Sequence, residues 1–392
     1  MKTKIIIGLI TILNLSTAFA ETIKRKDEDE KSKERLFQAT VIPGFGTSNG
    51  AAEMYQNKLS FNLFAGSEYS FEGFEMGGFY NVDKSDITGV QIAGFGNSAG
   101  GSAIGLQLGG FNNIVKGELT GAQISGFLNY AGDSTKGWQL SGFTNISKGN
   151  IKGSQISGFA NISTEDIKGA QISGFVNVSN NSKGLQMAGF VNKSNEINGM
   201  QWSGFLNKAK TVKGVQVGII NIADSVKSGA TIGLINIVKS GLVQFATENN
   251  DVTDVNLVFR SGTKTLYTIL SAGVETKEEF IWSYGVGLGT QHNFNNNVFG
   301  NIELSSHAIN TSEGHSDDLN LLNRFNLNIG YQIARKLSLN AGPVLNIYVT
   351  RVVDPETKKY GTVGLAEKTF FNKTYSGTNL KMWIGYSVSL KF

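Results

Sequence analysis

The chain has 392 residues, enough for one large domain or for two or three of ordinary size. It contains 49 Gly and 25 Phe but only three Pro and no Cys, so it is too aromatic for a disordered chain and too rich in glycine for long helices. The formal net charge of +4 is too small to indicate nucleic-acid binding, and the composition favours an all-β protein.

Residues 1–20 have the features of a secretory signal peptide. Lys2 and Lys4 precede an apolar run from Ile5 to Leu15, and small residues lead to Ala20. An uncleaved membrane anchor is the alternative, but the apolar run is shorter than the roughly 20 residues that a helix needs to cross a bilayer. We therefore expect cleavage after Ala20 on export. Because the chain has no Cys, we expect neither a lipid anchor nor a disulfide.

The next two segments precede the main pattern of the chain. Residues 21–35 include TIKRKDEDEKSKER, which is dense in charges of both signs and predicts a solvated tether, or alternatively a charged interaction arm. Residues 36–72 predict N-terminal β-strands, because apolar and polar residues alternate from Phe37 to Phe45 and from Leu59 to Ala65. We expect this pair of strands to join the sheet at the C-terminus.

Residues 73–243 form a tandem repeat with the consensus G-x-Q-(I/L/V/M)-(S/A)-G-F-x-N-(I/V). The first glycines are Gly73, Gly89, Gly105, Gly121, Gly137, Gly153, Gly169, Gly184, Gly199, Gly214 and Gly229. The spacing is 16 residues six times and then 15 residues four times, which makes eleven copies of one structural unit. The repeat Asn occurs in every copy, from Asn81 to Asn236, and Phe is unbroken from Phe79 to Phe205.

A unit of this length is too short for a pair of helices and favours one turn of a β-solenoid. Glycines would mark the corners, and successive turns would stack about 4.8 Å apart. Stacked Asn and Gln amides could then hydrogen-bond along a column, and stacked Phe rings would bury one another. The alternative is an array of short antiparallel hairpins, because periodicity alone does not distinguish the two.

Residues 244–392 change to long two-residue alternation, which predicts a C-terminal domain resembling an outer-membrane antiparallel β-barrel. The clearest segment is LKMWIGYSVSLKF at Leu380–Phe392, with apolar residues on one face and mostly polar residues on the other. Further candidate strands are 255–259, 264–274, 280–294, 298–308, 319–333 and 337–349. With the two N-terminal strands we expect eight or ten in all; a soluble β-sandwich is the alternative.

The motifs of the chain resemble those of the surface-repeat proteins of Bacteroidetes and spirochaetes. The resemblance runs from about Leu36 to Phe392 and includes the GxQxxGFxN array, GLIN at Gly233–Asn236, VNLVFRSG at Val255–Gly262, SYGVGLGT at Ser283–Thr290 and the closing KMWIGYSVSLKF. It is specific in the repeats and looser in the alternating strands. It implies an exported protein of the cell surface or outer membrane and lends no catalytic residues.

We expect no catalytic, cofactor-binding or metal site. The histidines are His292, His307 and His315, and the segment SEGHSDD, with Glu313, His315, Asp317 and Asp318, is explained better as a hydrated turn than as a cation site. We interpret the acidic residues of the repeats as solvating charges in the links: Asp83, Asp86, Glu118, Asp133, Glu165, Asp166 and Glu196. An enzyme is disfavoured because the consensus positions hold Gln, Ser and Asn where a glycan-cleaving solenoid needs paired carboxylates.

Two groups of side chains could serve binding. Trp138, Trp202, Tyr80 and Tyr130 could form an aromatic surface for sugars, although packing is the commoner role of such residues. Lysines in the links could form a basic edge that discourages pairing with other chains: Lys148, Lys152, Lys168, Lys183 and Lys213.

The sequence therefore predicts a non-enzymatic outer-membrane repeat protein that acts as a structural or binding scaffold. Its expected partners are the outer membrane and a surface ligand or glycan. A small pore or transport accessory is the first alternative, although we find no ring of charges on the polar strand faces that would indicate ion selectivity. An envelope carbohydrate-active enzyme is the second.

Overall fold

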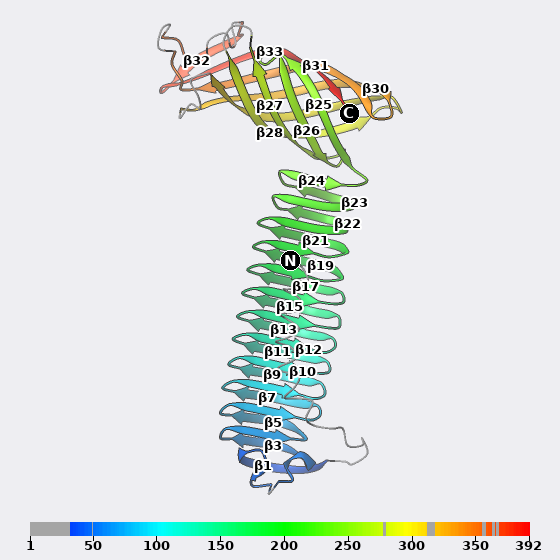
Figure 1. The fold of residues 1–392 in the computed structure, drawn as a ribbon, viewed down its shortest axis with the longest axis vertical. Coiled ribbons are helices and arrows are strands. Elements are labelled where there is room, and N and C mark those ends of the chain that lie inside the picture. The colour runs from blue at the N-terminus through cyan, green and yellow to red at the C-terminus, as the bar shows by residue number, and fades with distance from the viewer. Residues whose placement is uncertain are drawn as a thin grey trace.

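The computed structural model describes residues 32–48, 50–276, 280–311, 318–354, 358–362, 365 and 368–392. It consists of a long column of stacked strands with a curled antiparallel sheet at its C-terminal end (Figure 1). The predicted signal peptide lies outside the described residues, as do most of the predicted tether and residues 312–317 of the SEGHSDD segment. Within the described ranges, the single helix is a 3-10 turn, η1 (Ala52–Met54), and no helix is long and apolar enough to cross a membrane.

The column is a parallel β-solenoid in which most turns have one long and one short strand. The long strands are β3 (Tyr55–Asn62), β5 (Ser70–Gly77), β7 (Ile87–Ala93), β9 (Ala103–Gly109), β11 (Leu119–Ser125), β13 (Thr135–Ser141), β15 (Ile151–Ser157), β17 (Ile167–Ser173), β19 (Asn181–Ala188) and β21 (Glu196–Ser203). The short strands are β4 (Ala65–Glu68), β6 (Tyr80–Asp83), β8 (Gly96–Ala99), β10 (Asn112–Val115), β12 (Leu128–Ala131), β14 (Thr144–Ser147), β16 (Ala160–Ser163), β18 (Val176–Val178), β20 (Val191–Lys193) and β24 (Ile235–Val238). In β22 (Leu206–Val217) and β23 (Ile220–Ile232) a short strand runs on into the next long one.

Each repeat forms one turn, and equivalent residues stand directly above one another. β15 pairs in parallel with β13 and with β17, so that Gln155 lies between Gln139 and Gln171. On the short strands Asn161 lies between Asn145 and Asn177 in the same way. The solenoid prediction is therefore confirmed, and the alternative of antiparallel hairpins is excluded for the repeats.

Two ladders of buried amides run through the interior in opposite directions. Asn145 donates from Nδ2 to Oδ1 of Asn161 in the following turn at 2.9 Å, whereas Gln155 donates from Nε2 to Oε1 of Gln139 in the preceding turn at 2.8 Å. Asn145 also donates to backbone oxygens of its own turn and of the next. The repeated polar residues thus satisfy one another inside a narrow core, where an unpaired amide would be costly.

The two glycine columns have different roles. The first glycine of the repeat lies inside the long strand and not at a corner as predicted; Gly153 has φ +140°, and a Cβ there would lie 1.9 Å from the carbonyl oxygen of Gly137. The second glycine, such as Gly158, does lie at the corner between β15 and β16. Close stacking of backbones therefore excludes a side chain at the first position.

The N-terminal strands correct a prediction. β1 (Lys33–Ile42) pairs in parallel with β3, which pairs in parallel with β5, so both strands extend the solenoid and do not join the C-terminal sheet. Short β2 (Phe45–Gly46) folds back on β1. Apolar alternation is equally compatible with either partner sheet, which is why the sequence did not distinguish them.

The C-terminal part is an antiparallel sheet with nine strands among the described residues. The sequence predicted eight or ten strands and included the N-terminal pair, which belongs to the solenoid instead. The strands of the sheet are β25 (Leu242–Asn250), β26 (Val255–Gly262), β27 (Tyr267–Glu275), β28 (Ile281–Asn293), β29 (Val298–Thr311), β30 (Asn320–Ala334), β31 (Leu337–Thr350), β32 (Phe371–Tyr375) and β33 (Thr378–Lys391). Neighbours in the chain pair with one another, except that β33 lies between β31 and β32. β25 also pairs with β33, so the first strand of the sheet is joined to its last long strand.

The sheet is attached directly to the last turn of the solenoid. Nδ2 of Asn236, the last member of the Asn ladder, donates to Oγ1 of Thr268 in β27 at 3.0 Å. The backbone N–H of Asn236 donates to Oγ of Ser261 in β26, also at 3.0 Å. The Asn ladder therefore ends on side chains of the sheet, which accept from both the backbone and the side-chain N–H groups of its last member.

Candidate functional site

The outer surface of the long strands, which we call the long face, is apolar over much of its length. In each turn the residues on either side of the buried Gln point outward, and beside them lies the Phe at the corner. Exposed members include Ile124, Leu140, Ile156, Trp202 and Ile232. Apolar columns of this length on the surface of a protein are characteristic of interaction sites.

The Phe column is a continuous stack of rings along this face. From Phe79 to Phe205 successive centroids lie 4.7–5.0 Å apart, and the planes are within 19° of parallel. The rings are stacked as predicted, but they line the surface and are not enclosed: the exposed fraction is 55% for Phe79 and 42% for Phe175. The backbone spacing of the turns holds them in contact, so they present one aromatic ribbon.

The other predicted binding residues are distributed over different parts of the solenoid. Trp138 and Trp202 are exposed on the long face, whereas Tyr80 and Tyr130 lie half-buried on short strands, so the four do not form one surface. A basic column does form beside the first glycines of the repeats. It consists of lysines that stack in register on successive long strands: Lys136, Lys152, Lys168 and Lys183.

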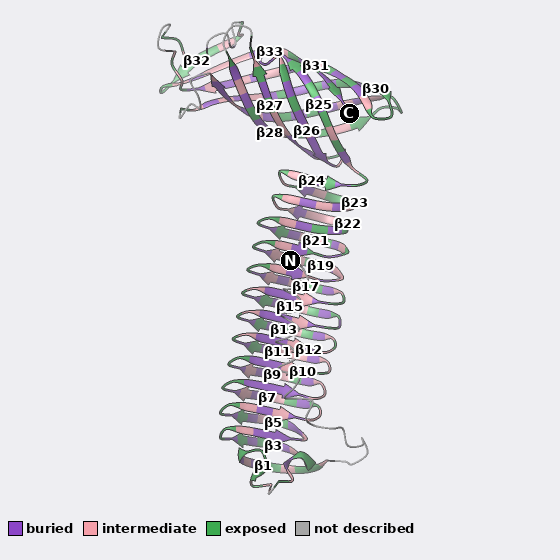
Figure 2. Ribbon diagram, in the orientation of Figure 1, coloured by how far each residue is buried: buried purple, intermediate pink, exposed green. Residues whose placement is uncertain are grey.

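Figure 2 shows that buried and exposed residues alternate along the strands of the C-terminal sheet. Many of the exposed residues are apolar and many of the buried ones are polar, which is the reverse of a sheet in water. In β30, Phe325, Leu327 and Ile329 are exposed, while Arg324 and Asn326 are buried. Exposed apolar residues occur on all the long strands: Val243, Phe245, Val255, Leu257, Val274, Tyr284, Val286, Leu288, Ile302, Leu304, Phe325, Leu327, Ile329, Tyr331, Ile333, Leu339, Ile384, Tyr386, Val388 and Leu390. The buried polar residues include Glu248, Asn256, Arg260, Asn301, Glu303, His307, Asn320, Arg324, Asn326, Asn328, Asn340, Asn346, Ser387, Ser389 and Lys391.

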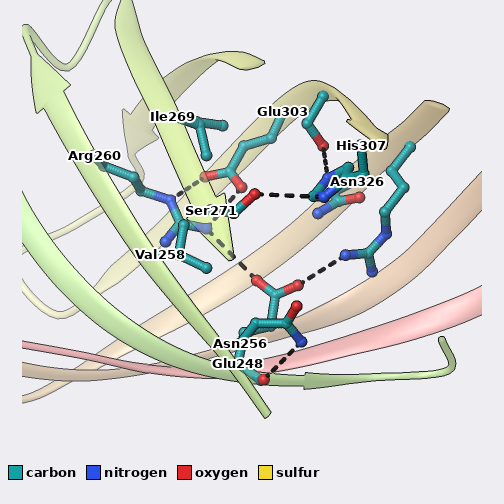
Figure 3. Close-up of a pocket in the computed structure, with 11 residues that line it drawn as sticks. Glu248, Asn256, Val258, Arg260, Ile269, Ser271, Glu303, His307 and Asn326 are labelled. Atoms are coloured by element: carbon teal, nitrogen blue, oxygen red, sulfur yellow. Dashed lines mark hydrogen bonds and ion pairs between the residues drawn. The ribbon is translucent and has the colours of Figure 1, made fainter. Parts of the chain in front are cut away.

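The interior of the sheet contains an ionic network (Figure 3). Arg260 forms a bidentate pair with Glu303, with both N–O distances 2.8 Å. Arg324 contacts Glu248 at 3.1 Å, and Tyr267 donates its hydroxyl hydrogen to Glu303 at 2.7 Å. Charges this deeply buried are stable only when paired, so the network links β25, β26, β29 and β30 across the interior.

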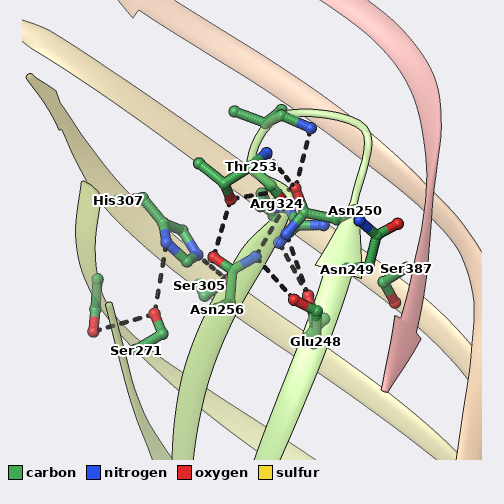
Figure 4. Close-up of polar contacts among 12 residues, drawn as sticks. Glu248, Asn249, Asn250, Thr253, Asn256, Ser271, Ser305, His307, Arg324 and Ser387 are labelled. Carbon is green, nitrogen blue, oxygen red and sulfur yellow. Dashed lines mark hydrogen bonds and ion pairs between the residues drawn. The ribbon is translucent and has the colours of Figure 1, made fainter. Parts of the chain in front are cut away.

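Polar side chains close the network near the turn between β25 and β26 (Figure 4). Asn250 Oδ1 accepts from the backbone N–H of Thr253 at 2.9 Å, and Asn256 Nδ2 donates to the backbone oxygen of Glu248 at 3.1 Å. Beyond this turn the interior is filled by an apolar cluster: Val252, Ile281, Ile309, Leu322, Tyr348, Leu365 and Trp383. Side chains therefore occupy the interior along the strands.

One Ser–His pair has the geometry of a nucleophile and base, but its surroundings do not support catalysis. Ser305 Oγ and His307 Nε2 lie 2.9 Å apart, and the other ring nitrogen contacts the hydroxyl of Ser271 at 3.4 Å. Among the described residues no carboxylate bonds to this imidazole, and both residues are buried. A hydrolytic triad needs a carboxylate in that place and access for substrate.

The sequence interpretation missed the ionic network and misplaced one acidic residue. Arg260, Glu303 and Arg324 were not singled out, although they occupy the polar faces of alternating strands, and that signal was available. The sequence analysis found no ring of charges on those faces; the charges there are instead paired with one another. Asp83, interpreted as a solvated link residue, is 2% exposed and lies at the end of β6. Asp86 and Asp133 are exposed as expected.

The chain matches no family model, and comparisons with curated proteins and with solved structures find no match. The class of protein is therefore defined by the fold: an all-β protein in which a parallel β-solenoid of 15- and 16-residue repeats with Asn and Gln ladders continues into an antiparallel sheet. Its candidate sites are the long face and the polar interior of the sheet.

Proposed function

We propose that this protein is a non-catalytic scaffold of the bacterial cell envelope, with its C-terminal sheet embedded in the outer membrane and its solenoid acting as a rod for binding. The inverted burial of the sheet carries this proposal. A sheet in water buries its apolar face, whereas lipid favours an apolar outer face and leaves polar residues for the interior. The predicted signal peptide and the resemblance to envelope repeat proteins support the same location.

The backbone pairing of the sheet also suits lipid. A strand edge in the hydrocarbon layer would leave N–H and C=O groups without partners. Here Ala246–Asn250 of β25 pair with Ser387–Lys391 of β33, so this part of the edge of the first strand is covered. β28, β29, β30, β31 and β33 have 13–15 residues, more than the 9–11 or so that a tilted strand needs to cross.

The lengths of the connections favour one orientation. At the end of the sheet that meets the solenoid, strands are joined by residues 263–266, 294–297 and 335–336. At the other end the connections include the longer segments 312–319 and 351–370. Because outer-membrane proteins have short turns on the periplasmic side and longer loops outside, we place the solenoid in the periplasm.

In this position the solenoid would carry the binding function. Its long face presents the same apolar and aromatic side chains in turn after turn, so weak contacts with an extended partner would add up by multivalency. The side chains that fill the interior of the sheet oppose the alternative of an open pore.

The test is the cost of a charge on the outer face of the sheet. Leu327→Arg places a cation where we expect lipid, and Leu140→Arg places the same cation on the exposed long face. Arginine near the middle of a bilayer costs about 2–4 kcal/mol. Chain refolded in the presence of lipid vesicles should therefore float with the vesicles as wild type and as Leu140→Arg, but much less as Leu327→Arg.

Equal flotation of the two variants would contradict membrane embedding of this face, as would a wild-type chain that stays in the aqueous fraction.

A further inference from the structure

Three acidic residues lie together inside the N-terminal end of the solenoid. They are Glu68 in β4, Glu75 in β5 and Asp83 in β6, all at most 2% exposed, and each offers a carboxylate oxygen within 4.8 Å of the others. Glu75 occupies the position that Gln91 takes one turn later, and Asp83 the position of Ala99. The first turns thus replace neutral residues of the column by carboxylates.

Among the described residues, no Lys, Arg or His forms an ion pair with these carboxylates. Burial raises the pKa of all three groups, and the charge of Glu68 raises the pKa of Glu75 further, to about 8. Buried carboxylates without a cationic side chain are held by protons or by a bound cation.

Buried oxygens without hydrogen-bond partners are a separate indication of a bound cation. Asn57 and Asn62, both at most 3% exposed, border the cluster: Nδ2 of Asn57 donates to Glu68 Oε2 at 2.6 Å, and Nδ2 of Asn62 donates to Glu75 Oε1 at 2.9 Å. Oδ1 of each of these amides has no hydrogen-bond partner, and neither has Oδ1 of Asp83. Amide and carboxylate oxygens without donors are the ligands of hard cations.

The direction of the Gln ladder favours negative charge at this end. Every Gln of the ladder donates toward the N-terminus, so its last donor faces the cluster: Gln91 Nε2 donates to Glu75 at 2.7 Å and to Asp83 at 2.6 Å. Aligned amide dipoles that point their N–H groups at a carboxylate stabilise its ionised form.

We propose that Glu68, Glu75 and Asp83 bind one divalent cation, with Ca²⁺ as the best fit, and that the ion fastens the first turns of the solenoid together. All available ligands are oxygens, which excludes the softer metals that prefer sulfur and imidazole. Ca²⁺ accepts irregular sets of six to eight such oxygens, whereas Mg²⁺ demands a near-ideal octahedron and retains water. Because the site is buried, the ion enters as the terminal turns close.

The repeat itself supplies matched variants. Glu75→Gln and Asp83→Ala introduce the residues that the next turn already has at these positions, so both should remain folded. Glu118→Gln removes a link carboxylate that pairs with Lys136 outside the cluster and is the control.

The experiment measures Ca²⁺ on the full chain after treatment with a chelator. Wild type and Glu118→Gln should take up about one Ca²⁺ per chain, and at about 100 times the dissociation constant the amides of β3–β6 should exchange about 100-fold more slowly. Glu75→Gln and Asp83→Ala should show neither effect while keeping the exchange pattern of β13–β17. Absence of Ca²⁺ uptake by the wild type would overturn the proposal, and protons would then be what holds the buried carboxyls. Uptake by the two cluster variants equal to that of the wild type would also overturn it.

Discussion

Removing one amide from the Asn ladder should loosen the solenoid locally. Asn145 is fully buried; it accepts from Asn129 at 2.9 Å and donates to Asn161 at 2.9 Å, to the backbone oxygen of Ile156 at 2.7 Å and to that of Gln139 at 3.1 Å. Asn145→Ala deletes these bonds, each with a net value of about 1 kcal/mol, and leaves Oδ1 of Asn161 buried without a donor at a cost of about 1–3 kcal/mol. We expect a local loss of about 3–5 kcal/mol, which is less than the sum of these terms because the two N–H hydrogens of Asn145 are shared among three acceptors.

Hydrogen exchange resolved along the full chain measures this loss where it occurs. Since 1.4 kcal/mol is a factor of ten, amides of β13–β17 should exchange about 100-fold faster or more. Each turn contacts only its neighbours, so β29 in the C-terminal sheet serves as the unchanged reference. Asn195→Ala is the control, because Asn195 is exposed and its amide bonds to Asn180 on the surface; its effect should stay within about 0.5 kcal/mol.

A change of less than about 1 kcal/mol for Asn145→Ala, or one no larger than that of Asn195→Ala, would refute the reasoning. Backbone pairing between turns would then hold the solenoid without help from the amide ladder.

Two further substitutions test the backbone of the solenoid and the interior of the sheet. Gly153→Ala combines a positive φ with a Cβ 1.9 Å from a carbonyl oxygen, so it should strongly destabilise its turn. Gly377→Ala has a positive φ but nothing within 4 Å of the new Cβ and should cost about 1 kcal/mol. If hydrogen exchange next to the substituted residue speeds up equally in the two variants, the close stacking at Gly153 is contradicted. Arg260→Met leaves the buried Glu303 without its ion-pair partner and should lower the stability of the sheet by about 3–5 kcal/mol in denaturant titration. Arg351→Met, at an exposed site, should have little effect, and equal unfolding midpoints of the two variants would show that the buried pair is dispensable.

The solenoid was predictable because its residues act in columns. A residue that must stack on copies of itself recurs at the spacing of the turn, so the Asn, Gln and Phe positions indicated both the period and the contacts between turns. The first glycine was assigned to a corner, since a sequence does not show whether a positive φ falls inside a strand or at its end.

The N-terminal turns were not predictable, because they lack the consensus. β1 and β3 carry Gln38 and Ser60 in the column that later holds Glu75 and Gln91, and no single residue type recurs there. Their alternation indicates strands but not which strands they pair with, since pairing depends on residues distant in the chain. Burial of Asp83, by contrast, could have been predicted from the repeats, because the following turns hold the apolar residues Ala99, Val115 and Ala131 at the equivalent position.

The candidate sites were predictable in part. Alternation in Leu380–Phe392 separated the apolar from the polar face correctly: Ile384, Val388 and Leu390 are exposed, and Ser387 and Lys391 are buried. Which charges meet inside the sheet could not be predicted, because Arg260 and Glu303 come from β26 and β29, which are not neighbours in the sheet.

Side-specific labelling tests the central claim most directly, and the natural chain helps because it contains no Cys. Asn150→Cys places one thiol in an exposed link of the solenoid, and Asn372→Cys places one in β32, at the end of the sheet with the long connections. With a membrane-impermeant thiol reagent, intact cells should label Asn372→Cys, and Asn150→Cys should label only after the outer membrane is permeabilised. Labelling of Asn150→Cys on intact cells would contradict a periplasmic solenoid, and recovery of both variants in the soluble fraction would contradict a membrane-embedded sheet.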